Sequence, residues 1–191
     1  SMKPVIGLIG LGAMGGGMAR SLNAAGHTLR VFDTRPEAAA AFAQEGGTAC
    51  GSVAELASGC DVVISVVVNA TQTEAVLFGL DGDGSGCAGA MKPGSVFVMC
   101  STVDPAASIR FEARLAGRGI HYLDAPISGG AAKAASGEIT MMTAGRPEAY
   151  ERAGAVLDDM AAKVYRLGDS AGAGSKVKII NQLLAGVHIA A

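Results

Sequence analysis

Six residues near the start of the chain have the spacing of a phosphate-binding turn. Gly10-Leu11-Gly12-Ala13-Met14-Gly15 matches the pattern G-x-G-x-x-G, between an apolar run and a stretch with helical periodicity. In this pattern the glycines permit a tight turn, and the free N–H groups at the start of the helix attract a pyrophosphate. The stretch predicts dinucleotide binding, and all six residues are assigned to the cofactor site. A glycine turn that only packs helix on sheet, and the differently spaced glycine loop of methyltransferases, are the alternatives.

An acidic residue follows the glycines at the distance that ribose recognition requires. Asp33 stands 18 residues after Gly15, at the end of the second predicted strand, where its carboxylate can accept hydrogen bonds from both ribose hydroxyls. A 2′-phosphate would repel it by about 1 kcal/mol in water and about 4 kcal/mol near a protein surface. Asp33 therefore favours NAD over NADP by roughly ten- to a thousandfold. Arg35 could pair with a 2′-phosphate, stack on adenine or remain in solvent, and the sequence leaves these three roles open.

A second polar group interrupts the apolar stretch at the end of the sequence. Lys178, Asn181 and Gln182 share one face of an ideal helix, and isoleucines, leucines and Val187 cover the other sides. A helix that is apolar over most of its circumference is normally covered by other parts of a protein. We therefore expect a further domain to cover it. Taken alone, Lys178 fits a solvent-facing position at least as well as a catalytic one.

Strands and helices alternate along the residues that carry these motifs. Apolar runs predict strands at residues 5–9, 28–32, 62–68, 95–99, 122–123, 139–143 and 164–167. Helices are expected to begin near residues 14, 36, 53, 71, 105 and 147, while the small-residue segment 128–137 is expected to be a loop. This alternation predicts an α/β fold with a doubly wound, mostly parallel sheet and helices on both faces.

The composition excludes several classes of protein. Half of the 191 residues are apolar, 17% are charged and the net charge is −2, which argues against a nucleic acid or a membrane surface as partner. The four cysteines form no C-x-x-C pair and the three histidines lie far apart, so we expect no metal site and no disulfide framework. A cytoplasmic location and a small-molecule ligand are the expectations that remain.

Four motifs in order resemble the β-hydroxyacid dehydrogenase family. They are the glycine turn, Cys100-Ser101-Thr102-Val103, Asp124-Ala125-Pro126-Ile127-Ser128-Gly129-Gly130, and Gly172-x-Gly174-x-x-x-Lys178-x-x-Asn181. The resemblance covers nearly the whole chain, and the stretch from Asn181 to His188 is similar to members that oxidise four-carbon sugar acids. It implies a Rossmann-like NAD-binding domain at residues 1–173, the start of a long inter-domain helix at 174–191, and an all-α C-terminal domain absent from this sequence.

The resemblance also implies roles for individual residues around the substrate. Lys178 would be the catalytic group, selected over Lys176 by its distance from Gly174. Asn181 would hold the substrate hydroxyl or orient the lysine. The backbone of Ser128, Gly129 and Gly130 would bind the substrate carboxylate, and Ser101 would contribute at the opposite wall.

Further residues are assigned to the cofactor and to substrate selection. Val68, Asn69 and Thr102 are assigned to the cofactor site, and Thr102 or Asn69 could contact the nicotinamide half of the cofactor. We hypothesise that Lys133, three residues beyond Gly130, pairs with a longer polyol acid, and a solvated loop lysine is the equal alternative. His188 could reach the far end of an extended substrate or pack against the further domain.

Together these roles imply an NAD-dependent dehydrogenase for a short hydroxy acid, homo-oligomeric when complete. Other family members act on 3-hydroxyisobutyrate or reduce tartronate semialdehyde, and a single sequence distinguishes these activities poorly from one another. Some relatives keep the fold as a dinucleotide-binding or oligomerisation module without catalysis, but they tend to lose the lysine that stands here at 178. We expect this chain by itself to bind NAD without useful turnover.

Overall fold

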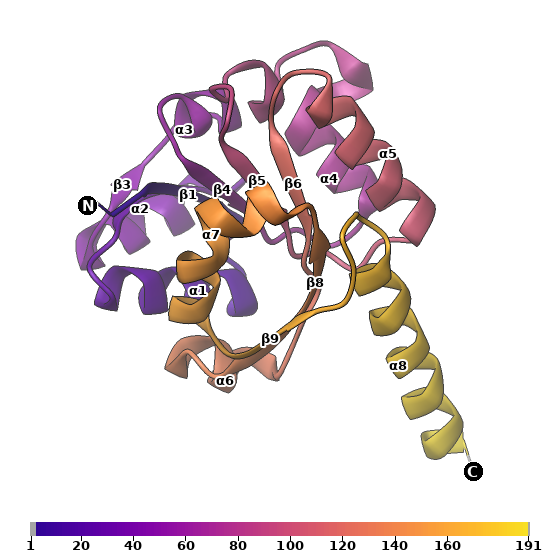
Figure 1. The fold of residues 1–191 in the computed structure, drawn as a ribbon. Helices are drawn as coiled ribbons and strands as arrows, with labels where there is room; N and C mark the ends of the chain where they lie inside the picture. The colour runs from indigo at the N-terminus through magenta and orange to yellow at the C-terminus, as the bar shows by residue number, and fades with distance from the viewer. Residues whose placement is uncertain (1–2, 191) are drawn as a thin grey trace.

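A twisted, mostly parallel sheet with helices on both faces forms the body of the protein (Figure 1). The computed structural model describes the backbone of residues 3–190 and the side-chain surroundings of residues 3–184. Across the sheet of this described part, the strands are β3 (Thr48–Ala49), β2 (Thr28–Phe32), β1 (Val5–Ile9), β4 (Val62–Ser65), β5 (Val96–Met99), β6 (His121–Asp124), β8 (Ile139–Gly145) and β7 (Ile127–Ser128), with β9 (Ala161–Arg166) beside β8. Across the sheet from β3 to β6, every two adjacent strands are parallel. β8 is antiparallel to both β6 and β7. The predicted doubly wound, Rossmann-like α/β fold is confirmed.

Helices pack on the two faces as separate layers. One face carries α1 (Ala13–Ala24), α2 (Pro36–Glu45), α6 (Gly130–Ser136) and α7 (Pro147–Met160), which bury Ile6 and Leu8 of β1. The other carries α3 (Val53–Ala57), α4 (Ala70–Phe78), α5 (Pro105–Ala116) and the 3₁₀ turn η2 (Cys87–Gly89), which bury Val63 and Phe97. The central strands supply alternate residues to the two layers, and for this reason their sequences are apolar in both registers.

One row of paired residues crosses the sheet at its carboxyl edge. Ile9 pairs with Ser65, Ser65 with Met99, and Met99 with Asp124. Because neighbouring strands lie about 4.8 Å apart, this row spans roughly 14 Å from β1 to β6. The segments that follow the four residues therefore leave the sheet at the same edge. In open α/β sheets, ligands bind at this edge, beside the point where the strand order reverses, which here lies between β1 and β4.

Polar side chains fix the starts of two helices near this edge. Ser52 Oγ accepts a hydrogen bond from the N–H of Glu55 at α3 (3.0 Å), and this helix begins where the sequence predicts it. At α4, Asn69 Oδ1 accepts from the N–H of Gln72 (2.9 Å), and Gln72 Oε1 accepts from the N–H of Val68 (2.7 Å). Such reciprocal bonds satisfy N–H groups that a helix start leaves without partners. The segment between β4 and α4 is thereby held in place.

The structure corrects the predicted extent of the third long strand. β4 ends at Ser65, and not at Val68, which is 76% exposed. The residues from Val66 onward turn away from the sheet along the carboxyl edge. Apolar character alone could not reveal this, because a cofactor site and a strand interior both favour valine. The strand β3 was also missed, since two exposed residues give no pattern.

The segment predicted as a small-residue loop contains a helix. α6 packs directly on α1, and a Cβ on Gly17 of α1 would lie only 2.6 Å from the backbone N of Ala135. Ser21 of α1 also donates a hydrogen bond to the carbonyl of Ala134 (3.1 Å). Close packing of two backbones requires small residues on both helices. The resulting composition lacks the large apolar periodicity by which a helix is recognised.

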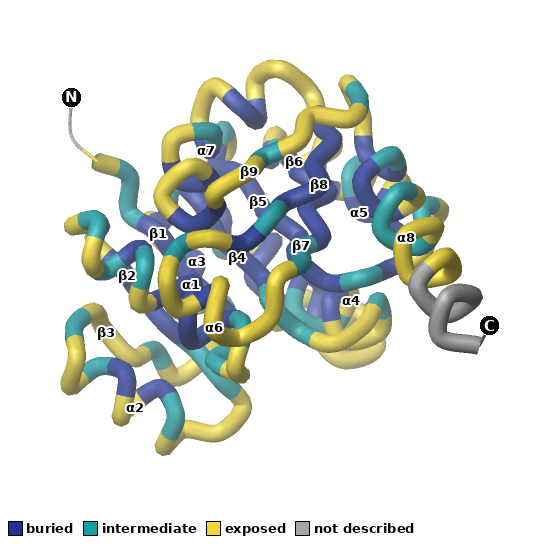
Figure 2. Tube along the Cα trace, turned by 90° about the horizontal axis from the view of Figure 1, so that it is seen from below, coloured by how far each residue is buried: buried dark blue, intermediate teal, exposed yellow. Residues whose placement is uncertain are grey.

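The last described helix, α8 (Ala173–Ala190), begins at the carboxyl edge and extends away from the sheet (Figures 1 and 2). Its apolar side chains Ile180, Leu183 and Leu184 are exposed. The side chain of His188 lies outside the described residues. Within the described part of the chain, no helix has both the length and the apolar character needed to cross a bilayer.

Candidate functional site

The glycine turn between β1 and α1 is built as the sequence predicts, and three of its glycines have different physical roles. Gly10 has φ +101°, and a Cβ there would lie 2.2 Å from the carbonyl oxygen of Val66. Gly15 lies in the first turn of α1, and its Cβ would lie 1.8 Å from the carbonyl oxygen of Gly10. Gly12, at the N-cap of α1, would place a Cβ in open space with no protein atom within 4 Å. Gly10 and Gly15 therefore shape the turn, and Gly12 leaves the helix start open for a ligand.

The remaining residues of the motif complete this turn. Ala13 and Met14 form the first positions of α1, where backbone N–H groups lack partners inside the helix. The N–H of Leu11 instead donates to Asp33 Oδ2 (2.8 Å). An anion at this helix start would meet free N–H groups and the positive end of the helix dipole.

A cavity of about 560 Å³ opens beside the turn at the carboxyl edge of the sheet. Of the predicted cofactor residues, Gly10, Gly12, Asp33, Arg35 and Val68 line it. Apolar residues from α3, α4 and the segment after α4 form another part of its wall, among them Val53, Val76 and Leu80. A pocket with an apolar slot beside an anion-binding turn has the features that an adenine nucleotide requires.

Asp33 joins the end of β2 to the glycine turn. Its Oδ1 accepts from the N–H of Arg35 (2.8 Å) and pairs with the Arg35 Nε (3.2 Å), while Oδ2 holds the turn through Leu11. Partial burial acts to raise the pKa of Asp33, but the two backbone donors and the guanidinium outweigh it and hold the pKa below its ordinary value. Asp33 is thus an ionised acceptor at the cavity wall. Arg35 is exposed and bound to Asp33, a partner that the sequence analysis did not consider, and its three predicted roles stay predictions.

Replacing the charge of Asp33 should alter cofactor preference. Asp33→Asn keeps an oxygen acceptor but removes the repulsion of a 2′-phosphate and releases Arg35 from its ion pair. We expect the ratio of NADP to NAD affinity to rise by about tenfold or more. Calorimetric titration with both nucleotides measures this, and the double change with Arg35→Ala serves as control because it should lose part of the gain. An unchanged ratio in Asp33→Asn would show that this carboxylate does not select the cofactor.

The segment 66–69 follows β4 and passes the mouth of the cavity. Val66, Val67 and Val68 line the cavity, whereas the Asn69 side chain caps α4. Gln72, which was not predicted from the sequence, also lines the cavity and binds the N–H of Val68. The capping pattern of Asn69 and Gln72 was the signal in the sequence that could have identified it.

Ser101 and Thr102 follow β5 at the same edge. Ser101 is 4% exposed, and its hydroxyl donates to the carbonyl of Val67 (2.7 Å). Thr73 of α4 donates to the Ser101 oxygen (3.3 Å). In this arrangement Ser101 holds the segment 66–69 in place, while Thr102 is half-buried beside it. The assignments of Ser101 to substrate and Thr102 to nicotinamide stay predictions.

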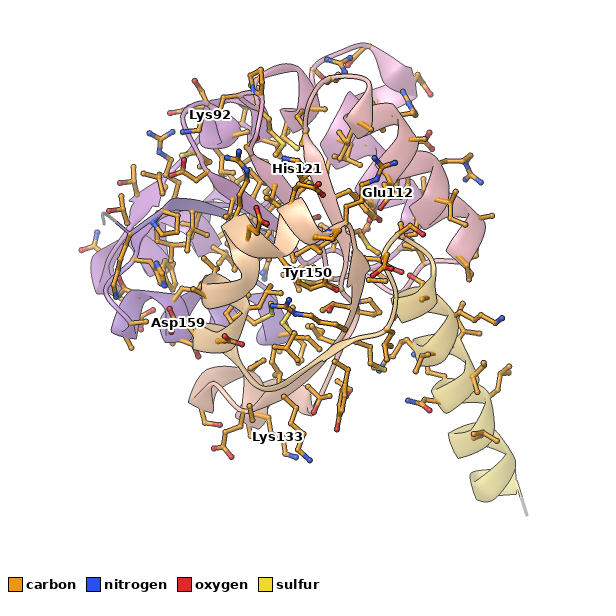
Figure 3. All side chains as sticks on the ribbon, viewed as in Figure 1. Lys92, Glu112, His121, Lys133, Tyr150 and Asp159 are labelled. Carbon is orange, nitrogen blue, oxygen red and sulfur yellow. The ribbon has the colours of Figure 1, made fainter. Side chains whose placement is uncertain are left out.

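The residues Ser128, Gly129 and Gly130 connect β7 to α6. Ser128 ends the strand, Gly130 begins the helix, and both glycines have positive φ (+130° and +77°). Lys133 therefore lies on a helix and not in a loop, as the sequence had suggested. It is exposed on the outer side of α6 (Figure 3), and its Cδ would lie 3.1 Å from a Cβ on Gly129. The lysine stem thus folds over the glycine pair.

The polar face of α8 starts at the opposite end of the site. Lys178 is half-buried and Asn181 is exposed, with its Nδ2 donating to the sulfur of Met142 (3.7 Å). The helix begins beside β6, so Lys178 lies about five residues, or roughly 7.5 Å, along its axis from the carboxyl edge. α6 and α8 both extend below the sheet in Figure 1. The Lys133 and Lys178 helices therefore flank the same side of the molecule.

A buried carboxylate to which the sequence assigned no role connects these parts. Asp124 ends β6, is 0% exposed and accepts hydrogen bonds from Gly172 and Ser175 at the start of α8. It belongs to a motif that was noted only for its serine and glycines. A charged residue within an otherwise apolar strand was the available signal, because such groups are rarely buried without partners.

The fold and the site define the class of protein. A six-strand order 3-2-1-4-5-6, a glycine turn with an open helix start and an acidic residue after β2 make a dinucleotide-binding domain of the Rossmann type. A family model described as the NAD binding domain of 6-phosphogluconate dehydrogenase matches residues 5–168. The chain belongs to this family, and its cofactor is NAD. The family resemblance seen in the sequence is confirmed.

Relatives and solved structures agree with this assignment. The chain is 59% identical to an L-threonate dehydrogenase of Cupriavidus necator over 190 residues, which cover 100% of this chain and 63% of that protein. An L-threonate dehydrogenase of Escherichia coli O6:H1 is 46% identical over 97% of this chain and 61% of that protein. The crystal structure of a 3-hydroxyisobutyrate dehydrogenase from Salmonella typhimurium is similar with a TM-score of 0.92 and 46% identity, over 98% of this chain and 64% of that chain. The chain therefore spans less than two thirds of the length of these proteins.

Proposed function

We propose that the whole protein oxidises a short hydroxy acid with NAD, and that the substrate is L-threonate, oxidised at carbon 2. The observation that carries this proposal is the shared carboxyl edge. The row from Ile9 to Asp124, together with the bonds from Asp124 to the start of α8, brings the glycine turn and the Lys178 helix to the same edge of the sheet. The similarity to two L-threonate dehydrogenases supports the choice of substrate.

The residues of the site divide the work of such a reaction. Bound NAD supplies the hydride acceptor. The start of α1 binds its pyrophosphate, Asp33 its ribose, and the segment 66–69 with Thr102 the nicotinamide end. Lys178 either accepts the proton of the substrate hydroxyl or polarises the hydroxyl oxygen. Hydride leaves a carbon readily only when the attached oxygen loses its proton. Asn181 orients this hydroxyl, Ser128, Gly129 and Gly130 hold the carboxylate end, and Ser101 contributes at the opposite wall.

Lys133 is the residue we propose for selection of a four-carbon acid. Its stem lies over Gly129, so its ammonium can reach beyond a carboxylate held at the glycine pair. Lys133→Met should raise KM about tenfold for L-threonate and much less for a three-carbon hydroxy acid, because only the longer substrate reaches the ammonium. Steady-state kinetics with both acids measure this. Equal changes in KM would remove Lys133 from substrate selection.

A second candidate function is that of 3-hydroxyisobutyrate dehydrogenase, which the name of the similar Salmonella protein favours. A tartronate semialdehyde reductase and a non-catalytic dinucleotide-binding module would use the same fold. A panel of hydroxy acids, assayed with the full-length protein and NAD at 340 nm, separates these four functions. Fastest turnover of L-threonate supports the proposal, and absence of turnover for every acid would leave the module.

We also propose the setting in which this enzyme works. Residues 1–173 form the NAD-binding domain, and 174–191 begin an inter-domain helix that leads to an all-α domain. Exposed Ile180, Leu183 and Leu184 on α8 support such a cover. The complete enzyme is a homo-oligomer in the cytoplasm, a location that the four free thiols support.

A further inference from the structure

The start of α8 is held by a carboxylate from another part of the chain. Asp124 Oδ2 accepts hydrogen bonds from the N–H of Gly172 (3.0 Å) and of Ser175 (2.9 Å), and Oδ1 accepts from the Ser175 hydroxyl (2.5 Å). Gly172 is the residue before the helix, so Ser175 is its third position. A side-chain oxygen bound to that N–H is what an N-cap aspartate provides locally. Gly172 has no side chain, and Asp124 takes this function from the end of β6.

Close contacts with the sheet also fix the position of the first turn of α8. Gly172 adopts φ +111°, and a Cβ on Gly174 would lie 2.3 Å from the carbonyl oxygen of Met142 in β8. Glu112 of α5 holds the preceding residue, since its Oε2 accepts from the N–H of Ala171 (2.9 Å; Figure 3 labels Glu112). The first turn of α8 thus lies directly on the backbone of the sheet.

We propose that Asp124 is a positioning residue for the reaction, acting through Lys178. Lys178 stands three residues beyond Ser175, so one helical turn joins the anchored N–H to the amine. Asp124 also ends β6, in the row of paired residues that begins at Ile9, and Ile9 directly precedes the glycine turn. Asp124 therefore fixes the distance and the rotation of Lys178 relative to the nicotinamide end of the cofactor. This inference rests on the proposed function.

The bonding pattern predicts different results for two substitutions in the full-length enzyme. Asp124→Asn can keep all three bonds, because its amide can accept from the two N–H groups and donate to the Ser175 oxygen. We expect its kcat to stay within about fivefold of the parent. Asp124→Ala removes every bond, and because a shift of about 1 Å at a reacting group can cost about a hundredfold, kcat should fall by about that factor. The Kd for NAD should change less than about threefold in both, since the glycine turn is untouched.

Two further variants keep the test decisive if Asp124→Ala does not fold. Gly174→Ala displaces the helix start from Met142 while Asp124 remains, and it should lower kcat about tenfold or more with NAD affinity unchanged. Glu112→Gln keeps its acceptor and removes one charge at the same place, so its kcat should match the parent. If Asp124→Asn loses as much kcat as Asp124→Ala, the charge and not the position is what matters, and the inference fails. Parent-like kcat in Asp124→Ala, or in Gly174→Ala, overturns it as well.

Amide hydrogen exchange separates this inference from the proposed function. In Asp124→Ala the Ser175 amide should lose its protection, and in Asp124→Asn it should keep it, whatever reaction the enzyme catalyses. Absence of dehydrogenase activity in the parent, with this exchange pattern intact, would refute the proposed function and leave the anchoring by Asp124 in place. Unchanged protection of Ser175 in Asp124→Ala would refute the anchoring itself.

Discussion

Replacing Lys178 with alanine should lower kcat of the full-length enzyme about a thousandfold, which corresponds to about 4 kcal/mol of transition-state stabilisation. The reason is that no other lysine or arginine is predicted to face the reacting hydroxyl. The Kd for NAD should stay within about twofold, because the pyrophosphate and ribose sites lie at the other end of the sheet's edge. Stopped-flow absorbance at 340 nm measures the chemical step directly, and calorimetry measures the affinity.

The matched control for Lys178 lies two residues earlier on the same helix. Lys176 is exposed, and a separation of two residues turns its side chain about 200° away. Lys176→Ala should therefore keep kcat within about twofold. Lys178→Arg adds a distinction, since arginine keeps the positive charge but does not release its proton. Partial activity in this variant indicates that Lys178 polarises the hydroxyl, and complete loss indicates that it accepts the proton. Loss of turnover in Lys176→Ala with normal Lys178→Ala would contradict the assignment.

Alanine at Gly10 and at Gly12 should separate the architecture of the turn from its function. Gly10→Ala places a Cβ 2.2 Å from the Val66 carbonyl oxygen at a residue with φ +101°. We therefore expect the free energy of unfolding to fall by about 1–3 kcal/mol and NAD binding to be lost as well. Gly12→Ala meets no protein atom within 4 Å. It should leave stability unchanged and raise the Kd for NAD about a hundredfold, because the methyl group occupies the space of the pyrophosphate.

Both effects can be measured on this chain by thermal unfolding and by calorimetric titration. Gly16→Ala is the control, since its Cβ would have no neighbour closer than 3.5 Å and it lies inside α1. It should keep NAD affinity and be neutral or stabilising by about 0.5–1 kcal/mol. If Gly12→Ala binds NAD as well as the parent does, the pyrophosphate does not lie at this helix start.

Much of the architecture follows from local pattern in the sequence. The runs at Val5–Ile9 and Thr28–Phe32 gave both strand ends correctly, because each is bounded by residues that end a strand. The extent of β4 was wrong, since valines 66–68 remain apolar after they leave the sheet. The helix α6 was missed because its packing on Gly17 selects small residues, which resemble a loop in composition.

The parts of the site formed by a short local motif could be predicted from the sequence. The parts that depend on hydrogen bonds between residues far apart in the sequence could not. The glycine turn and Asp33 needed only spacing, and the cavity lies beside them. The bonds from Asp124 to Gly172 and Ser175 join residues 48 and 51 positions apart, which no local pattern reports. The bond from Ser101 to the carbonyl of Val67 likewise depends on two neighbouring strands ending at one edge.

The position of Lys178 relative to the cofactor tests the proposed mechanism most directly. A crystal structure of the full-length enzyme with NAD and L-threonate gives this as a measured distance. We predict the pyrophosphate at the Gly12 N–H and the Lys178 Nζ about 2.7–3.2 Å from the oxygen on carbon 2, with that carbon about 3–3.5 Å from the nicotinamide C4. A Lys178 amine more than about 8 Å from the substrate oxygen, with NAD in place and the two domains closed, would contradict it.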